Sequence, residues 1–263
     1  MRRAQLHEKA LQPGRPAPGD KAAASQRLRG IYSLLFKAFG PQGWWPVTPP
    51  GKYVPVYSSG VYGPLPERGA FEICAGAILT QNTAWKNVEK ALEELHRGGL
   101  LDARKIAGCA LPRLERAIRS SGYFRQKARR LKAFCARAGR EHPEGFSKWF
   151  SGAAAPALRE ELLSYKGVGP ETADSMVLYA AGKASFVIDA YTRRMGERAG
   201  LGRGLSYGGW KALFEGALEP DVKVYNEYHA LLVRLGKDFC KKTRPLCGSC
   251  PLNKVCAKRI NKL

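Results

Sequence analysis

The sequence has few acidic residues. Its 263 residues include 22 Asp and Glu against 44 Lys and Arg, so the net charge is +22. A positive excess of this size attracts polyanions, and nucleic acid is the commonest of them. An anionic membrane surface is the competing partner, but no long helical pattern combines a basic face with a bulky apolar face. The charge balance therefore favours a nucleic acid partner.

Long apolar runs are missing as well. No uncharged apolar segment is long enough to cross a bilayer, and residues 1–15 lack the apolar region of a secretory signal. We therefore expect no membrane partner. The seven cysteines have no disulfide-like spacing and favour a reducing cytoplasm. Cys74, Cys109 and Cys135 lie in apolar helical patterns, which predicts that they are small buried side chains.

Strand patterns are nearly absent, apart from a short extended piece at residues 185–188. Apolar residues recur instead at helical spacing, as in Ala173, Met176, Val177 and Ala180, so the fold class is all-α. Residues 1–25 have no periodicity and are predicted to form a flexible basic tail, and the Pro- and Gly-rich residues 48–68 an irregular excursion. Helices are predicted over residues 27–39, 156–164, 170–181, 190–200 and 221–239, and from Phe124 onward.

Four cysteines near the C-terminus, Cys240, Cys247, Cys250 and Cys256, have the order C-x6-C-x2-C-x5-C. A structural zinc site usually has two short pairs separated by a dozen or more residues, whereas here single cysteines flank one close pair. The compact loop favours a [4Fe–4S] cluster, which needs four thiolates around one inorganic core. Zinc is the alternative. The loop also carries many basic residues: Lys241, Lys242, Arg244, Lys254, Lys258 and Arg259.

Two glycines interrupt the helical pattern at residues 166–173. Gly167 and Gly169 permit a tight turn and a close approach to a ligand, and free amides at the start of the next helix form an anion site. The dinucleotide fingerprint G-x-G-x-x-G is one alternative, since Asp189 follows Gly169 by twenty residues. It fails because Thr172 replaces the third glycine and a helix, not a strand, precedes the turn. A helical corner without a ligand is the other alternative.

These features together resemble the helix-hairpin-helix DNA glycosylases of the endonuclease III superfamily. The matching segments are residues 76–83 (GAILTQNT), 121–124 (SGYF), 166–173 (the hairpin), 187–189 (VID) and the cysteine loop. Residues 44–46 (WWP) and 79–83 (LTQNT) are most similar to the branch that acts on 3-methyladenine and related alkylpurines. The resemblance covers residues 27–256, nearly the whole chain.

The resemblance implies a two-lobed fold with a cleft between the lobes. The flexible tail would be followed by an N-terminal helix and loop (26–69) that pack with the C-terminal lobe. A six-helix barrel that ends in the hairpin would span residues 70–189. The C-terminal helices and the iron–sulfur loop would span residues 190–263. DNA and an extruded base would lie in the cleft, with Asp189 at its floor.

Asp189 is the catalytic candidate that the resemblance implies. Cleavage of an N-glycosidic bond builds positive charge on the sugar, which a fixed carboxylate stabilises, and the carboxylate can also orient or deprotonate water. Its alternative role is to cap the helix that begins at Ala190. Family members that cleave the strand have a nucleophilic Lys at the position of Glu171, and a carboxylate cannot form an imine. Lys166 lies on the other side of the glycines, where a phosphate contact is expected.

Base extrusion requires a wedge and a receiving pocket. Gln81 resembles the residue that fills the vacated space, and Tyr123 the one that wedges beside the opposite base. The expected DNA contacts in the hairpin are Lys166, Gly167, Val168, Gly169 and Thr172. The pocket candidates are Trp44, Trp45, Pro46 and Trp85, since an indole face attracts a cationic alkylated purine. Without the resemblance, the tryptophans would be interpreted as core.

The resulting hypothesis is a monomeric, monofunctional glycosylase that hydrolyses damaged bases, most of all alkylated purines, from double-stranded DNA in the cytoplasm, where it would associate with the nucleoid. The cluster would hold the basic loop against DNA and have no redox role. One alternative is an endonuclease III-like enzyme with lyase activity on oxidised pyrimidines. Another, of a different class, is a DNA-binding module that senses distorted duplexes without catalysis.

Overall fold

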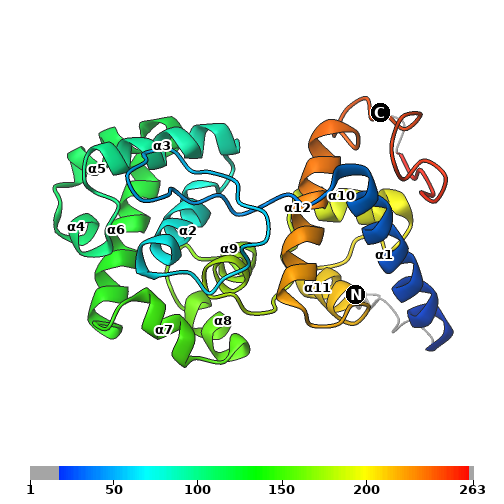
Figure 1. The fold of residues 1–263 in the computed structure, drawn as a ribbon, viewed down its shortest axis with the longest axis horizontal. Coiled ribbons are helices and arrows are strands. Elements are labelled where there is room, and N and C mark those ends of the chain that lie inside the picture. Colours follow the sequence, from blue (N-terminus) through cyan, green and yellow to red (C-terminus); the bar gives the residue numbers. More distant parts are fainter. Residues whose placement is uncertain (1–17, 261–263) are drawn as a thin grey trace, which may run out of the picture.

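The computed structural model describes residues 18–260, which form two groups of helices joined by extended segments (Figure 1). The larger group contains α2 (Glu67–Leu79), α3 (Trp85–Arg97), α4 (Ala103–Gly108), α5 (Leu111–Ala117), the 3-10 turn η1 (Arg119–Ser121), α6 (Phe124–Glu141), α7 (Phe146–Gly152), α8 (Ala155–Leu163), α9 (Pro170–Ser175) and the π-helical turn η2 (Met176–Ala180). The smaller group contains α1 (Pro18–Phe39), α10 (Ala190–Ala199), α11 (Tyr207–Glu215), α12 (Val222–Asp238) and the cysteine loop.

The predicted all-α fold is confirmed. Residues 18–260 contain no strand, only one isolated antiparallel bridge between Val47 and Val56. None of the described helices is both apolar and long enough to span a membrane. The helix α1 begins at Pro18 rather than at residue 27, because proline is accepted in a first turn and alanines at 22–24 favour helix. The tail prediction is therefore wrong for residues 18–25, and residues 1–17 lie outside the described part.

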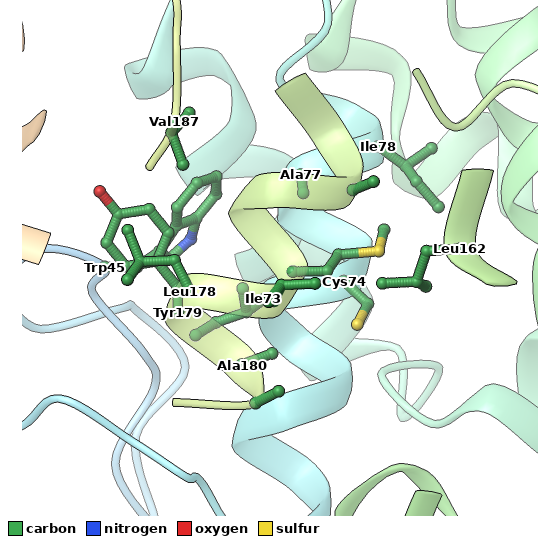
Figure 2. Close-up of a cluster of buried hydrophobic side chains, with 14 of the residues drawn as sticks. Trp45, Ile73, Cys74, Ala77, Ile78, Leu162, Leu178, Tyr179, Ala180 and Val187 are labelled. Carbon is green, nitrogen blue, oxygen red and sulfur yellow. The ribbon is translucent and has the colours of Figure 1, made fainter. Parts of the chain in front are cut away.

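The core of the larger group forms around α2, which is buried from Ala70 to Leu79. Its faces contact η2, α6 and α7, and Figure 2 shows Ile73 beside Leu178 and Ala180, with Ile78 on the other side of α2 toward Leu162. Of the three cysteines expected to be buried, Cys74 and Cys135 are buried. Cys109 is only partly buried, because it follows the short helix α4 at its C-terminal end.

Two buried carboxylates fix the irregular segment between α1 and α2, which crosses from one helix group to the other. Glu227 of α12 accepts hydrogen bonds from the Gln42 amide (2.8 Å) and the Tyr62 hydroxyl (3.2 Å). Glu72 of α2 accepts from the Thr48 amide (3.0 Å) and hydroxyl (2.7 Å). Both carboxylates are almost fully inaccessible to solvent. The segment therefore has one defined path, although its sequence has no regular pattern.

A third buried carboxylate, Asp174, fixes the second connection, residues 182–189. It accepts from Arg159 (2.7 Å), Ser185 (2.6 Å) and Tyr207 (2.7 Å), and Lys211 lies 3.0 Å away. These partners come from α8, α11 and the connection itself. The network therefore holds the chain just before Asp189 in place.

Candidate active site

A cleft lies between the two helix groups and is lined from both sides. The larger group contributes the loop 80–83 after α2 and the hairpin 167–172. The smaller group contributes the start of α10 and the end of α12 with the beginning of the cysteine loop. Basic side chains dominate its charged lining: Arg130, Arg193, Arg194, Lys237, Lys241 and Lys242. The cleft thus suits a polyanion.

Asp189 lies in this cleft at the N-cap of α10. One carboxylate oxygen, Oδ1, accepts a hydrogen bond from the Thr192 amide at 2.7 Å, which confirms the predicted helix cap. The other oxygen, Oδ2, lies 3.7 Å from Nε2 of His229. Only 8% of the residue is exposed, and burial alone would raise its pKa. His229 and the Thr192 amide outweigh burial and hold the pKa below its ordinary value, so the carboxyl is ionised at neutral pH.

Glu171, in the first turn of α9, lines the same cleft. Partial burial and the negative charge of Asp189 raise the pKa of its carboxyl. The cleft therefore holds two carboxyl groups whose pKa values are displaced in opposite directions.

The hairpin places its backbone at the cleft surface, from Gly167 through Thr172. Gly167 has a left-handed backbone (φ +89°), and a Cβ atom there would lie 2.9 Å from the Cδ of Arg130. The position thus requires glycine on both grounds. Lys166 is exposed beside the turn but is not among the residues that line the described cleft.

The two wedge candidates lie on neighbouring segments. Gln81 lines the cleft, where its side-chain NH2 group donates to the Gly167 carbonyl (2.9 Å) and the Thr172 hydroxyl (3.1 Å). The side-chain oxygen of Gln81 accepts a hydrogen bond from Arg130 (3.0 Å). Tyr123 has a left-handed backbone (φ +45°) and is 74% exposed. A large aromatic ring that is so exposed at the start of α6 is free to contact a partner.

Lys127 joins the segments that carry these two candidates, and the sequence analysis missed it. Its ammonium group donates to the Leu79 carbonyl (2.7 Å), the Thr83 hydroxyl (2.6 Å) and the Ser121 carbonyl (2.6 Å). The residue is 2% exposed, and burial lowers its pKa to about 8. Three neutral oxygens thus replace the water around this charge, and the bonds fix the loop 80–83 relative to residues 121–123.

Replacing Lys127 with Met is expected to slow base release from duplex DNA on the order of tenfold to hundredfold, because both wedge segments lose their common anchor. Lys132→Met is the matched control, since Lys132 of the same helix donates to the Ala107 and Cys109 carbonyls away from the cleft. The test is to measure the single-turnover rate of base release and the thermal stability of both variants. Equal rates for the two variants would contradict the assignment.

The structure brings the pocket candidates together. Ring centroids lie 5.0 Å apart for Trp44 and Trp45, 4.9 Å for Trp44 and Trp85, and 5.1 Å for Trp45 and Trp85. Pro46 is buried beside them. Trp45 and Trp85 are buried, whereas Trp44 is partly exposed, with the Lys237 ammonium 6.0 Å from its ring centroid. Lys237 also lines the cleft, whereas none of the four pocket candidates is among the residues that line it.

His229 and Tyr179 also belong to the site and were not identified from the sequence. Tyr179 of η2 packs against Trp45 (centroids 5.5 Å apart), as Figure 2 shows, and its hydroxyl lies 2.6 Å from Nδ1 of His229. A histidine on the apolar face of a helix gives no signal by itself. The four histidines of the chain show no common spacing that would have indicated it.

The four C-terminal cysteines line one cavity, together with Met195, Leu235, Phe239 and Leu252. A tetrahedral zinc ion with Zn–S bonds of about 2.3 Å would hold its sulfurs roughly 3.8 Å apart. Within residues 18–260, no three of these sulfurs lie within 4.8 Å of one another. The four thiols that line one cavity are the donor set that an iron–sulfur core needs.

Two arginines of α10 hold this loop. Arg194 donates to the Cys240 carbonyl (2.7 Å) and the Gly236 carbonyl (3.1 Å). Arg198 donates to the Cys240 sulfur (3.4 Å) and the Lys241 carbonyl (2.7 Å). Arg193 and Arg194 both line the cleft, and Arg194 is in addition bonded to the loop.

An all-α chain whose glycine hairpin and helix-capping aspartate line one basic cleft is a helix-hairpin-helix protein. A family model described as HhH-GPD superfamily base excision DNA repair protein matches residues 75–219. A Methanocaldococcus jannaschii protein assigned as a DNA repair glycosylase is 38% identical over 230 residues, or 87% of this chain and 95% of that protein. The chain therefore belongs to the HhH-GPD superfamily and is a DNA N-glycosylase.

Solved structures agree with this assignment. An endonuclease III trapped as a covalent intermediate on DNA has a TM-score of 0.69 at 23% identity, with 89% of this chain and 96% of that chain covered, which supports the fold. The H. pylori 3-methyladenine DNA glycosylase bound to 1,N6-ethenoadenine has a TM-score of 0.63 at 26% identity, with 81% and 97% covered. The resemblance to the endonuclease III superfamily is thus confirmed.

Proposed function

We propose that this glycosylase extrudes a damaged base, an alkylated purine in preference to others, and hydrolyses its glycosidic bond without cleaving the strand. The observation that carries the proposal is the pair of carboxyls in the cleft. Asp189 is ionised and buried, and Glu171 stands where the family resemblance implies a nucleophilic lysine in strand-cleaving members. The same proposal includes the division into domains at residues 70–189 and 190–263. It also includes that the protein is a monomer.

Asp189 acts on the sugar. As the bond between C1′ and the base nitrogen lengthens, the electron pair leaves with the base and positive charge develops on the deoxyribose. The Asp189 carboxylate stabilises this charge in a site from which water is largely excluded. A water molecule then forms the new bond to C1′, and its proton passes to Asp189 or to solvent. An alkylated purine leaves as a neutral base and needs no strong proton donor.

The hairpin and the wedge residues position the DNA in this proposal. The backbone from Gly167 to Gly169 and the side chains of Lys166 and Thr172 bind phosphates, with Val168 supporting the turn. Gln81 fills the space of the extruded base, and Tyr123 wedges beside the opposite base. The exposed Tyr123 ring and the cleft position of Gln81 support these roles.

The tryptophan group supports the choice of an alkylated purine. Indole faces stack on any base and attract a cationic one in particular. The H. pylori relative, a 3-methyladenine glycosylase bound to an ethenoadenine, supports the same substrate class. The similarity to endonuclease III proteins keeps an endonuclease III-like activity as the alternative.

The four cysteines, Cys240, Cys247, Cys250 and Cys256, would hold a [4Fe–4S] cluster. When bound, the cluster supplies a rigid core that fixes the basic loop, since hydrolysis requires no electron. Arg194 and Arg198 anchor the same loop to α10. Iron and acid-labile sulfide in equal amounts are expected in the purified protein, and zinc without sulfide would contradict the cluster.

A panel of duplexes tests the proposed substrate. Each carries one lesion, either an alkylated purine, an oxidised pyrimidine or a deaminated base, and free base is measured beside strand breaks. We expect base release from alkylated purines, with breaks only after alkali. Breaks at oxidised pyrimidines without alkali would support the endonuclease III-like alternative instead.

Substituting Glu171 with Lys is expected to create a strand-cleaving activity that the native protein lacks. The new amine would lie in the cleft with Asp189, where it can attack C1′ and form an imine. Borohydride trapping on an abasic or lesion-bearing duplex should give a covalent adduct with Glu171→Lys and none with the native protein. Glu160→Lys, at an exposed position of α8, is the control. A trapped adduct with the native protein would overturn the monofunctional proposal.

A further inference from the structure

Three polar residues form a buried chain across the junction of the two helix groups. The Tyr179 hydroxyl of η2 lies 2.6 Å from Nδ1 of His229 in α12, and Nε2 of His229 lies 3.7 Å from Oδ2 of Asp189. The three residues are 2%, 5% and 8% exposed. The chain ends at the one oxygen of Asp189 that does not cap α10.

The hydrogen positions in this chain follow from its surroundings. Burial raises the pKa of Tyr179 well above its ordinary value, so the phenol keeps its proton. In residues 18–260 its hydroxyl has no side-chain partner besides His229, so it donates to Nδ1. A neutral imidazole that accepts at Nδ1 carries its hydrogen on Nε2. That N–H is buried and has no hydrogen-bond partner among the described residues, and it faces the Asp189 carboxylate across 3.7 Å, a little beyond hydrogen-bond distance.

The opposite tautomer is disfavoured. With the hydrogen on Nδ1, a lone pair of Nε2 would face the ionised carboxylate, and the phenol proton would lose its acceptor. Two buried polar groups would then be unsatisfied, each at a cost of roughly 1–3 kcal/mol. The tyrosine therefore selects the imidazole form that suits the aspartate, as outer partners do for metal-bound histidines.

We propose that His229 is the positioning residue of this enzyme: locked by Tyr179, it directs Nε2–H at Oδ2 of Asp189 and keeps the carboxylate ionised and oriented under the deoxyribose. The proposal rests on the proposed role of Asp189. The other groups that face Asp189 are Glu171 from α9, whose charge opposes ionisation, and Arg193 from α10, which lines the cleft. From α12, His229 is the group that faces Asp189.

The first experiment needs no activity. In the native protein with 15N-labelled histidine, the ring nitrogen shifts of the neutral His229 ring should report a hydrogen on Nε2 and an unprotonated Nδ1. Tyr179→Phe should let the two tautomers mix. A hydrogen on Nδ1 in the native protein would overturn the proposal whether or not base excision is confirmed.

The second experiment is the pH profile of single-turnover base release. In His229→Phe the acid limb should move upward by about one pH unit or more, because only the Thr192 amide then offsets the burial of Asp189. The plateau rate should fall on the order of 10²-fold, with lesion binding unchanged. His229→Gln, whose amide can still donate to Oδ2, should keep the native acid limb.

The outcomes separate the inference from the function on which it rests. If His229→Phe lowers the rate of base release but leaves the acid limb of the pH profile unchanged, His229 has only a structural role and the inference is wrong. Native base release by Asp189→Asn would instead overturn the proposed function. A His229→Phe protein that fails to fold leaves the tautomer measurement and His229→Gln as the deciding results.

Discussion

Replacing Asp189 with Asn should slow base release on the order of 10³-fold and leave lesion binding intact. The substitution removes the negative charge that the developing cation requires, in a site where electrostatic stabilisation is strong. The Asn side-chain oxygen can still accept from the Thr192 amide, so the cap of α10 is preserved. Single-turnover base release and equilibrium binding to the same lesion duplex measure the two effects separately.

Asp221→Asn is the matched control for this change. Asp221 caps α12 with bonds from the Lys223 amide (2.7 Å) and the Val224 amide (3.1 Å), but it is exposed and lies outside the cleft lining. Native rates are expected for Asp221→Asn. Loss of release with normal binding in Asp189→Asn would exclude the module that binds without catalysis, whereas normal release would refute the catalytic role.

Sequence patterns predicted the elements that depend on local chemistry. The apolar spacing after Phe124 predicted α6, and proline at 156 and 170 marked the first turns of α8 and α9. Residues 170–181 were expected as one regular helix, yet they change to a π-turn at Met176. Such a turn adds one residue to a helix without a distinctive pattern, and it often occurs where a side chain must be re-aimed. Here it carries Tyr179.

The sequence predicted the functional positions that belong to a motif, and it did not predict the functional positions that belong to none. The hairpin glycines and Asp189 were identified because turn chemistry and the family resemblance fix their spacing. Lys127 stands among the basic residues of α6 and His229 next to an apolar run of α12, and neither position belongs to a motif. Their importance comes from partners far away in sequence, such as Leu79 for Lys127 and Tyr179 for His229.

Asp174→Asn should cost about 3–5 kcal/mol of unfolding free energy at neutral pH, because it leaves Arg159 and Lys211 facing a neutral group inside the protein. Asp174 is fully buried, and its four partners hold the connection that leads to Asp189. Asp238→Asn is the control, since its pair with Arg234 (3.6 Å) is exposed on both sides. Such pairs contribute about 0–1 kcal/mol. Urea denaturation of both variants measures the difference.

The stability difference between the native protein and Asp174→Asn should also depend on pH in one direction. Burial would raise the pKa of Asp174, but Arg159 and Lys211 outweigh it and hold the pKa below its ordinary value in the folded state. A carboxyl with a lowered folded pKa contributes stability that is fully present above its unfolded value of about 3.9 and is lost as pH falls through the folded value. The difference should therefore be largest at neutral pH and shrink below pH of about 4. A difference that stays constant down to strongly acidic pH would mean that shape, not charge, makes Asp174 necessary.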